Sequence, residues 1–118
     1  MQIDNLRQEV TNLHADVCSA LADPTRILIL YALSEKPYSV NNLANELGIP
    51  QPTTSRHLKV LRERNLVASI RQGMIVEYSL VDHRVIEALN LLRSVMRDRI
   101  SHRFNVVTDE FSETNKNR

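Results

Sequence analysis

SVNNLANELGIPQPTTSRHLKVL, residues 39–61, is the stretch of this chain that decides its fold. Ser39 favours a helix N-cap, apolar residues then recur at helical spacing, and Gly48 stands where a left-handed residue commonly ends a helix. After a turn at 48–50, a second helix is predicted over residues 51–64, and it is rich in small polar and basic side chains. This pattern is typical of a helix-turn-helix whose second helix enters the major groove of DNA.

The residues before this stretch predict two further helices. Residues 3–22 carry a narrow apolar seam with spacings of three and four, which is typical of an amphipathic helix. Asp23 and Pro24 then favour the start of a second helix, expected at about 25–33 and followed by a loop at 34–37. The side chains predicted to be buried in that second helix are Ile27, Leu28, Leu30 and Tyr31.

The residues after the stretch 39–61 predict a hairpin and a last helix. Strands are expected at 66–70 and 74–80 around a turn at 71–73, and Asp82 caps a long amphipathic helix. The order α-α-α-α-β-β-α is mainly α with a small β-hairpin, a winged helix-turn-helix. We expect one domain over residues 1–111 and a disordered tail at 112–118.

Two apolar seams, on the first and last helices, exceed what a small three-helix core can cover. We therefore expect a homodimer joined through these two helices, most simply with two-fold symmetry.

The composition favours a small helical protein of the cytoplasm. The chain has 118 residues, of which 42% are hydrophobic and 4% aromatic, so its core is aliphatic. The single cysteine cannot form an intrachain disulfide, which fits a reducing compartment. No apolar run approaches the ~18 residues of a membrane span, and no signal segment is expected. The net charge is only +1, but residues 49–80 carry five basic side chains and two acidic ones.

The candidate DNA contacts lie on the second helix of the motif and on the predicted wing, residues 70–75. Short polar side chains at a helix start suit phosphates and base edges, and longer donors one or two turns later suit guanine, adenine or phosphate. Wing-tip residues can enter the neighbouring minor groove or hold the backbone. The predicted contacts are Gln51, Thr53, Thr54, Ser55, Arg56, His57, Lys59, Arg71 and Gln72.

Three segments together resemble one known family. ALADPTRILIL at 20–30, LANELGIPQPTTSRHLKVLRERNLV at 43–67 and RQGMIVEYSL at 71–80 are similar to the ArsR/SmtB family of bacterial repressors. The resemblance implies a homodimer that binds an imperfect palindromic operator in double-stranded DNA and is released by a chemical inducer. Pro50 departs from the family pattern, which often has Ser as the cap of the recognition helix.

The metal sites that this resemblance implies are absent from the sequence. One uses a C-x-C pair in the third helix, where this chain has Leu43 to Leu47 without a thiol. The other begins D-x-H in the last helix, where Asp82 is followed by His83 and then Arg84. Its distal ligand positions hold Val95 and Asp98, so we predict neither site and no cofactor.

A candidate sensor remains on the first helix. His14 and Cys18 stand four residues apart, which places both side chains on one face of an α-helix, and His102 is a candidate third ligand. Three interpretations stay open. Cys18 is a buried packing thiol with His14 on the surface, a redox or sulfur sensor, or part of a soft-metal site.

Other classes of protein fit less well. An enzyme is disfavoured because the chain has no Gly-rich phosphate loop and no evident base paired with Cys18 in a cleft. A winged helix that only binds proteins has no need of the basic face. A winged-helix regulator of another family, such as a MarR-like protein, is disfavoured by the chain length and by ALADPTR.

Overall fold

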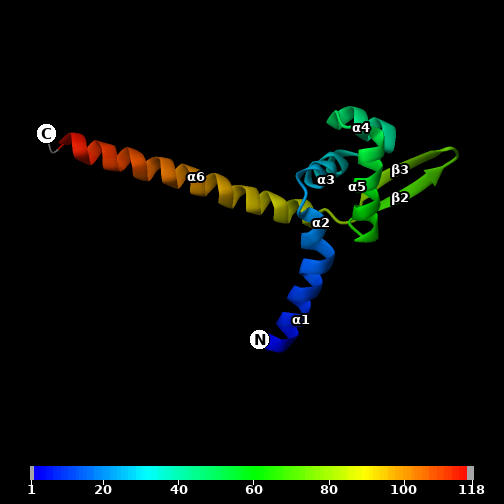
Figure 1. Ribbon diagram of the computed structural model, residues 1–118, viewed down its shortest axis with the longest axis horizontal. Coiled ribbons are helices and arrows are strands. Elements are labelled where there is room, and N and C mark those ends of the chain that lie inside the picture. Colours follow the sequence, from blue (N-terminus) through cyan, green and yellow to red (C-terminus); the bar gives the residue numbers. More distant parts are fainter. Residues whose placement is uncertain (1, 117–118) are drawn as a thin grey trace. The chain divides into compact units, whose positions relative to one another are not determined.

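A computed structural model describes the backbone of residues 2–116 and the side chains of residues 2–103. The chain forms two units, residues 1–83 and residues 84–118, which are described separately. The first unit contains the helix-turn-helix and a small sheet (Figure 1). The second is a single helix, α6 (Arg84–Lys116). The winged helix-turn-helix predicted from the sequence is confirmed in the first unit.

The first helical rod is interrupted by a wider turn. Helix α1 (Ile3–Leu13) is followed by a π-helical turn (His14–Cys18) and the short helix α2 (Ser19–Leu21). The Ser19 amide donates to the His14 carbonyl, the five-residue step that defines a π-helix. The predicted end near Ala22 is confirmed, whereas the π-helical turn was not predicted.

Helix α3 (Pro24–Glu35) begins as its sequence predicts. The Asp23 carboxylate accepts hydrogen bonds from the amides of Thr25 at 2.8 Å and Arg26 at 3.4 Å, and Pro24 occupies the first turn. The helix continues through residues 34 and 35, where a loop was expected. Its buried side chains are Ile29, Leu30 and Leu33.

The prediction that Leu28 is buried was wrong, because its side chain is 55% exposed. The helix is apolar on several sides, so the hydrophobic pattern alone does not fix which side meets the core.

We expect the N-cap at Asp23 to make stability depend on acidic pH. Burial acts to raise the pKa of Asp23. The hydrogen bonds from two amides and the nearby His57 and Arg26 act in the opposite direction and outweigh burial, so the pKa of Asp23 lies below its usual value. A carboxyl group whose pKa is lower in the folded state stabilises the fold at pH values above its unfolded-state pKa. That contribution is lost as the pH falls through the folded-state pKa. Thermal unfolding of Asp23→Asn, which keeps a capping side chain, should differ from wild type at neutral pH and converge with it in acid. A difference that stays constant across this range would contradict the assignment.

Helices α4 (Val40–Leu47) and α5 (Gln51–Glu63) form the helix-turn-helix. The Asn42 amide donates to the Ser39 hydroxyl at 3.2 Å, and Gly48 ends α4 with a left-handed φ of 67°. Pro50 is the N-cap of α5 and supplies no side-chain cap. Asn65 follows the end of α5 with φ 60°, a conformation that asparagine tolerates better than most residues. The predicted bounds of both helices are confirmed to within a residue.

The sheet has three antiparallel strands in the order β1-β3-β2. Strand β2 (Val67–Gln72) pairs with β3 (Ile75–Leu80), from Val67 opposite Leu80 to Gln72 opposite Ile75. Strand β1 (Tyr38–Ser39) pairs with β3 and was not predicted.

The hairpin turn lies further along the chain than expected. Arg71 and Gln72 belong to β2, and the two-residue turn is Gly73-Met74. Gly73 has φ 65°, as the first central residue of a type II′ turn requires.

The core of the first unit lies where α3, α4 and α5 meet the base of the hairpin. Its fully buried large side chains include Ile29, Leu30, Leu43, Leu58, Leu61 and Val67. Among the described residues, no single helix is long and apolar enough to cross a membrane. The rod 3–21 and α3 pass that test of length and composition only when taken together, and the chain bends by 86° between them. The α3 half of this pair supplies buried core residues.

In the second unit, the bounds of α6 extend to residue 116 and so include most of the predicted tail at 112–118. Side chains of that segment lie outside the described residues. The division into a domain at 1–111 and a disordered tail therefore stays a prediction.

Candidate nucleic-acid interface

Helix α5 has a buried side and an exposed side. The buried side chains of Thr54, Leu58 and Leu61 recur at spacings of three and four, and they anchor the helix in the core. The opposite side is exposed and carries polar and basic groups. Its members are Gln51, Pro52, Ser55, Arg56, Lys59, Arg62 and Glu63. Packing therefore orients the helix so that its donors face solvent.

The predicted contacts Gln51, Thr53, Ser55, Arg56 and Lys59 are accessible on α5. All are exposed except Thr53, which is half-buried at the edge of the exposed side. The Arg56 guanidinium donates to the Thr53 hydroxyl at 3.4 Å. These two side chains therefore support each other next to the first turn of the helix.

Thr54 is a correction to the predicted contacts. Its side chain is 0% exposed, and its hydroxyl donates to the Pro50 carbonyl at 3.0 Å. The same carbonyl accepts the Thr54 amide at 3.0 Å, so Thr54 closes the first turn of a helix that has no side-chain cap. Its neighbours Thr53 and Ser55 point elsewhere because successive helical residues are about 100° apart.

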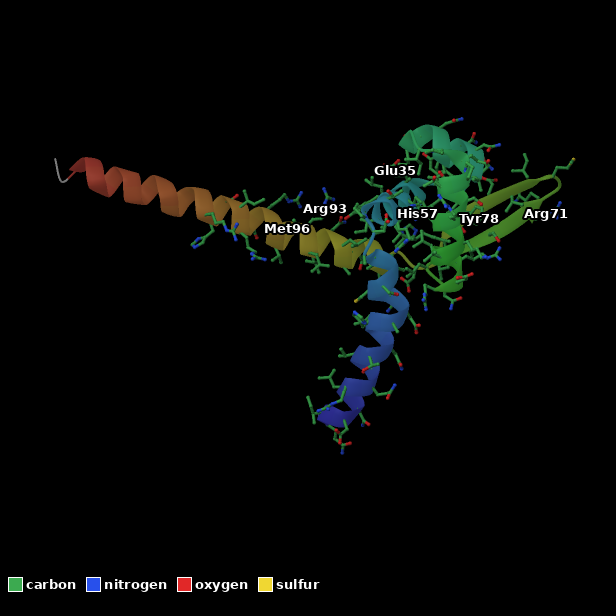
Figure 2. The ribbon with its side chains drawn as sticks, in the orientation of Figure 1. Glu35, His57, Arg71, Tyr78, Arg93 and Met96 are labelled. Atoms are coloured by element: carbon green, nitrogen blue, oxygen red, sulfur yellow. The ribbon has the colours of Figure 1, made fainter. Side chains whose placement is uncertain are left out.

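His57 lies at the joint between α5 and α3 rather than on the exposed side of α5 (Figure 2). Its Nδ1 is 3.4 Å from Nη1 of Arg26. Arg26 also donates from Nε to the Ala20 carbonyl at 2.6 Å and from Nη2 to the Ser19 carbonyl at 3.3 Å. One guanidinium thus joins two carbonyls of α2 to a ring on α5. We assign His57 to positioning α5.

A second link joins the first rod to α5. Arg64, the C-cap of α5, lies 3.6 Å from the carboxylate of Asp16 in the π-helical turn. Both side chains are exposed, so this ion pair adds little to stability.

The wing carries the other predicted contacts. Arg71 and Gln72 are exposed near the end of β2, and Figure 2 shows Arg71 in the outer part of the hairpin. The Arg71 Nε donates to the Gly73 carbonyl at 3.3 Å, which holds the guanidinium beside the turn. Two residues here were missed by the sequence reasoning. Arg62 is exposed and donates to the Ser69 hydroxyl at 3.4 Å, and Met74 forms the turn itself.

A cleft of about 510 Å³ separates the wing from the helix-turn-helix. Gln51, the first residue of α5, lines one wall, and Met74 and Ile75 of the hairpin line another. The remaining lining residues are the polar Ser39, Asn41, Asn42 and Glu77 and the apolar Val40 and Val76. The start of α5 and the tip of the wing therefore border one continuous depression.

The candidate sensor residues are all on the surface. Cys18 is exposed in the single chain. It lies on the helical rod that is expected to join two subunits, so the packing, redox and metal interpretations of Cys18 all stay predictions. The π-helical turn contains Cys18, and Ala20 of α2, which belongs to the predicted apolar seam, is buried. His14 and His102 are also exposed. Within the described part of the chain, no three or more His, Cys, Asp or Glu side chains are grouped to hold a metal ion.

These features define a winged helix-turn-helix protein with a polar and basic helix exposed beside a wing that carries Arg71. A family model for bacterial regulatory proteins of the arsR family matches residues 23–69. The nodulation protein NolR from Rhizobium meliloti is 34% identical over 92 residues, which are 78% of this chain and 75% of NolR. The chain therefore belongs to the ArsR family.

Two further relatives show how far the likeness extends. The repressor SmtB from Mycobacterium tuberculosis is 34% identical over 95 residues, covering 80% of this chain. The match spans 65% of the length of SmtB. The homodimeric winged helix-turn-helix DNA-binding domain Mb0332 from Mycobacterium bovis has a TM-score of 0.70 at 26% identity. That match covers 81% of this chain and 89% of the solved fragment of Mb0332, its residues 1–100.

Proposed function

We propose that this protein is a cytoplasmic, homodimeric transcriptional repressor that binds an imperfect palindromic operator and acts by binding, not by catalysis. Helix α5 lies in the major groove, and the wing contacts the neighbouring backbone or minor groove. The observation that carries the proposal is the exposed side of α5. It presents Ser55, Arg56 and Lys59 to solvent while Leu58 and Leu61 fix the helix from behind.

The homodimer rests on apolar side chains that the described chain leaves exposed. On α1, Ile3, Val10 and Leu13 are exposed, and on α6 the exposed apolar residues are Leu91, Leu92, Val95, Met96 and Ile100. Continuous apolar seams of this kind mark interfaces between proteins. A two-fold dimer also presents two copies of α5, which matches a palindromic site. The homodimeric domain Mb0332 supports the same assembly.

The experiment that tests the proposal is a titration of DNA with Arg56→Ala. The duplex is one selected by the wild-type protein from a randomised pool, and binding is followed by fluorescence anisotropy. We expect a loss of about 1–3 kcal/mol for each half-site, because a bidentate arginine contact to a base is removed in each subunit. Arg7→Ala, which removes the same charge from an exposed position on α1, is the matched control and should bind like wild type. Equal affinity of Arg56→Ala and wild type would remove Arg56 from the interface.

We propose that the inducer belongs to one of three chemical classes: a small molecule, a thiol-directed reagent, or a soft metal ion held by Cys18 and His14. The exposed thiol of Cys18 favours testing the second. Because the chain has one cysteine, an oxidised form needs the partner subunit's thiol or a small-molecule thiol. In the same titration, an oxidant that releases wild type but not Cys18→Ser would identify the sensor. Equal responses would exclude Cys18.

A further inference from the structure

The tip of the wing is apolar, although the wing is otherwise a solvated hairpin. Met74 is 95% exposed, and Ile70 and Ile75 are 55% and 59% exposed. In the strand register, Gln72 pairs with Ile75 and Ile70 pairs with Glu77, so the two isoleucines lie on the same face of the hairpin. A tip that only held a phosphate backbone would need donors, and methionine supplies none.

The surroundings of Met74 connect it to the proposed DNA interface. It lines the same cleft as Gln51, the first residue of α5. It also follows Arg71, whose guanidinium is held beside the turn by the Gly73 carbonyl. With α5 in the major groove, the strand of sugar and phosphate that separates the two grooves falls in this cleft. The turn beyond it then meets the minor groove.

The chemistry of methionine suits that position. The minor groove of B-DNA is only about 6 Å wide, which admits a narrow, unbranched side chain. Methionine is unbranched and flexible, and apolar wedges of this type insert between base steps and partly unstack them. Pyrimidine–purine steps cost least to unstack, so such a wedge selects sequence without reading a hydrogen-bond pattern.

We propose that Met74 is a specificity-determining residue of this protein, an apolar wedge that enters the minor groove beside each half-site and selects a deformable base step there. The proposal rests on the DNA-binding function proposed above. The phosphate-binding charge of Arg71 next to the wedge favours DNA as its occupant over another protein. Self-association through the wing is the alternative that the test also reports.

The test compares Met74→Ala and Met74→Gln with wild type on paired duplexes. Both duplexes carry the sequence selected by the wild-type protein, and they differ only in the flanking step, TA in one and AA in the other. Leu28→Ala is the control, because it removes an exposed apolar side chain from α3. Since Met74 is exposed, its variants should keep the thermal unfolding midpoint of wild type. Sedimentation in the absence of DNA reports any change in self-association.

We expect wild type and Leu28→Ala to prefer the TA duplex. Both Met74 variants should lose about tenfold in affinity for it at each half-site and bind the two duplexes alike, because each subunit no longer buries an apolar side chain in the complex. Their salt dependence should match that of wild type, since no phosphate contact is removed.

Three results would overturn the proposal. Unchanged affinity and unchanged step preference in both variants would remove Met74 from the interface while leaving the repressor function intact. A change in sedimentation without a change in DNA affinity would make the tip a protein contact. Failure of wild type to select any duplex would overturn the proposed function itself, and the wedge with it.

Discussion

Raising the salt concentration from about 50 to about 200 mM should weaken operator binding by about 10³-fold. Apart from Arg56, which is proposed to read a base, the exposed cations of the proposed interface are Lys59, Arg62 and Arg71. In a homodimer each occurs twice, and every phosphate they neutralise releases condensed counterions from the DNA. The logarithm of the binding constant should then fall with the logarithm of salt concentration at about −0.9 for each phosphate contact, or about −5 in total.

Anisotropy titrations at a series of salt concentrations measure this slope. Lys59→Ala should make it shallower by about two, one for each subunit, and should weaken binding to all sequences alike. Arg7→Ala changes the net charge equally but lies outside the proposed face, so its slope should equal that of wild type. A flat dependence on salt for the wild-type protein would contradict the proposed interface.

Leu58→Ala should lower the free energy of unfolding by about 2–5 kcal/mol, the range for truncating a fully buried leucine. Leu58 is 0% exposed and lies on the core side of α5, so the truncation leaves a cavity beneath the proposed recognition helix. Urea unfolding at one fixed protein concentration measures the change, because a dimer's apparent stability depends on concentration.

The control for this prediction is Leu28→Ala, the same substitution at a leucine that is 55% exposed. Surface replacements of this kind usually change stability by no more than about 0.5 kcal/mol. Equal losses in the two variants would mean that α5 does not rest on Leu58 in solution. A large loss at Leu28 alone would indicate that its side chain is covered in the assembled protein.

The helix-turn-helix could be predicted from the sequence because its signals are local. The caps at Asp23 and Ser39 act on amides two or three residues away, and Gly48 supplies a left-handed residue at one position. The apolar spacing of α4 and α5 likewise depends only on the period of the helix. The basic side of α5 was predicted by the same means, apart from Thr54 and His57.

What the sequence did not indicate depends on long-range packing. Strand β1 has only two residues, too few for any period, and it exists because Tyr38 meets Tyr78 of β3. Thr54 has the same local chemistry as Thr53, and only the packing of α5 sends it inward. The π-helical turn that contains Cys18 was not indicated by any capping or spacing signal.

The sequence by itself determined the family, the order of the elements and the helix that carries the donors, because these rest on short-range steric and hydrogen-bonding preferences. Only the tertiary structure decided which side of each helix is buried, where the hairpin turns, and which side chains border the same cleft. Those outcomes depend on how residues far apart in the chain come together, as Arg26 and His57 do at 3.4 Å and as Gln51 and Met74 do on two walls of one cleft. A linear pattern carries no record of such distances.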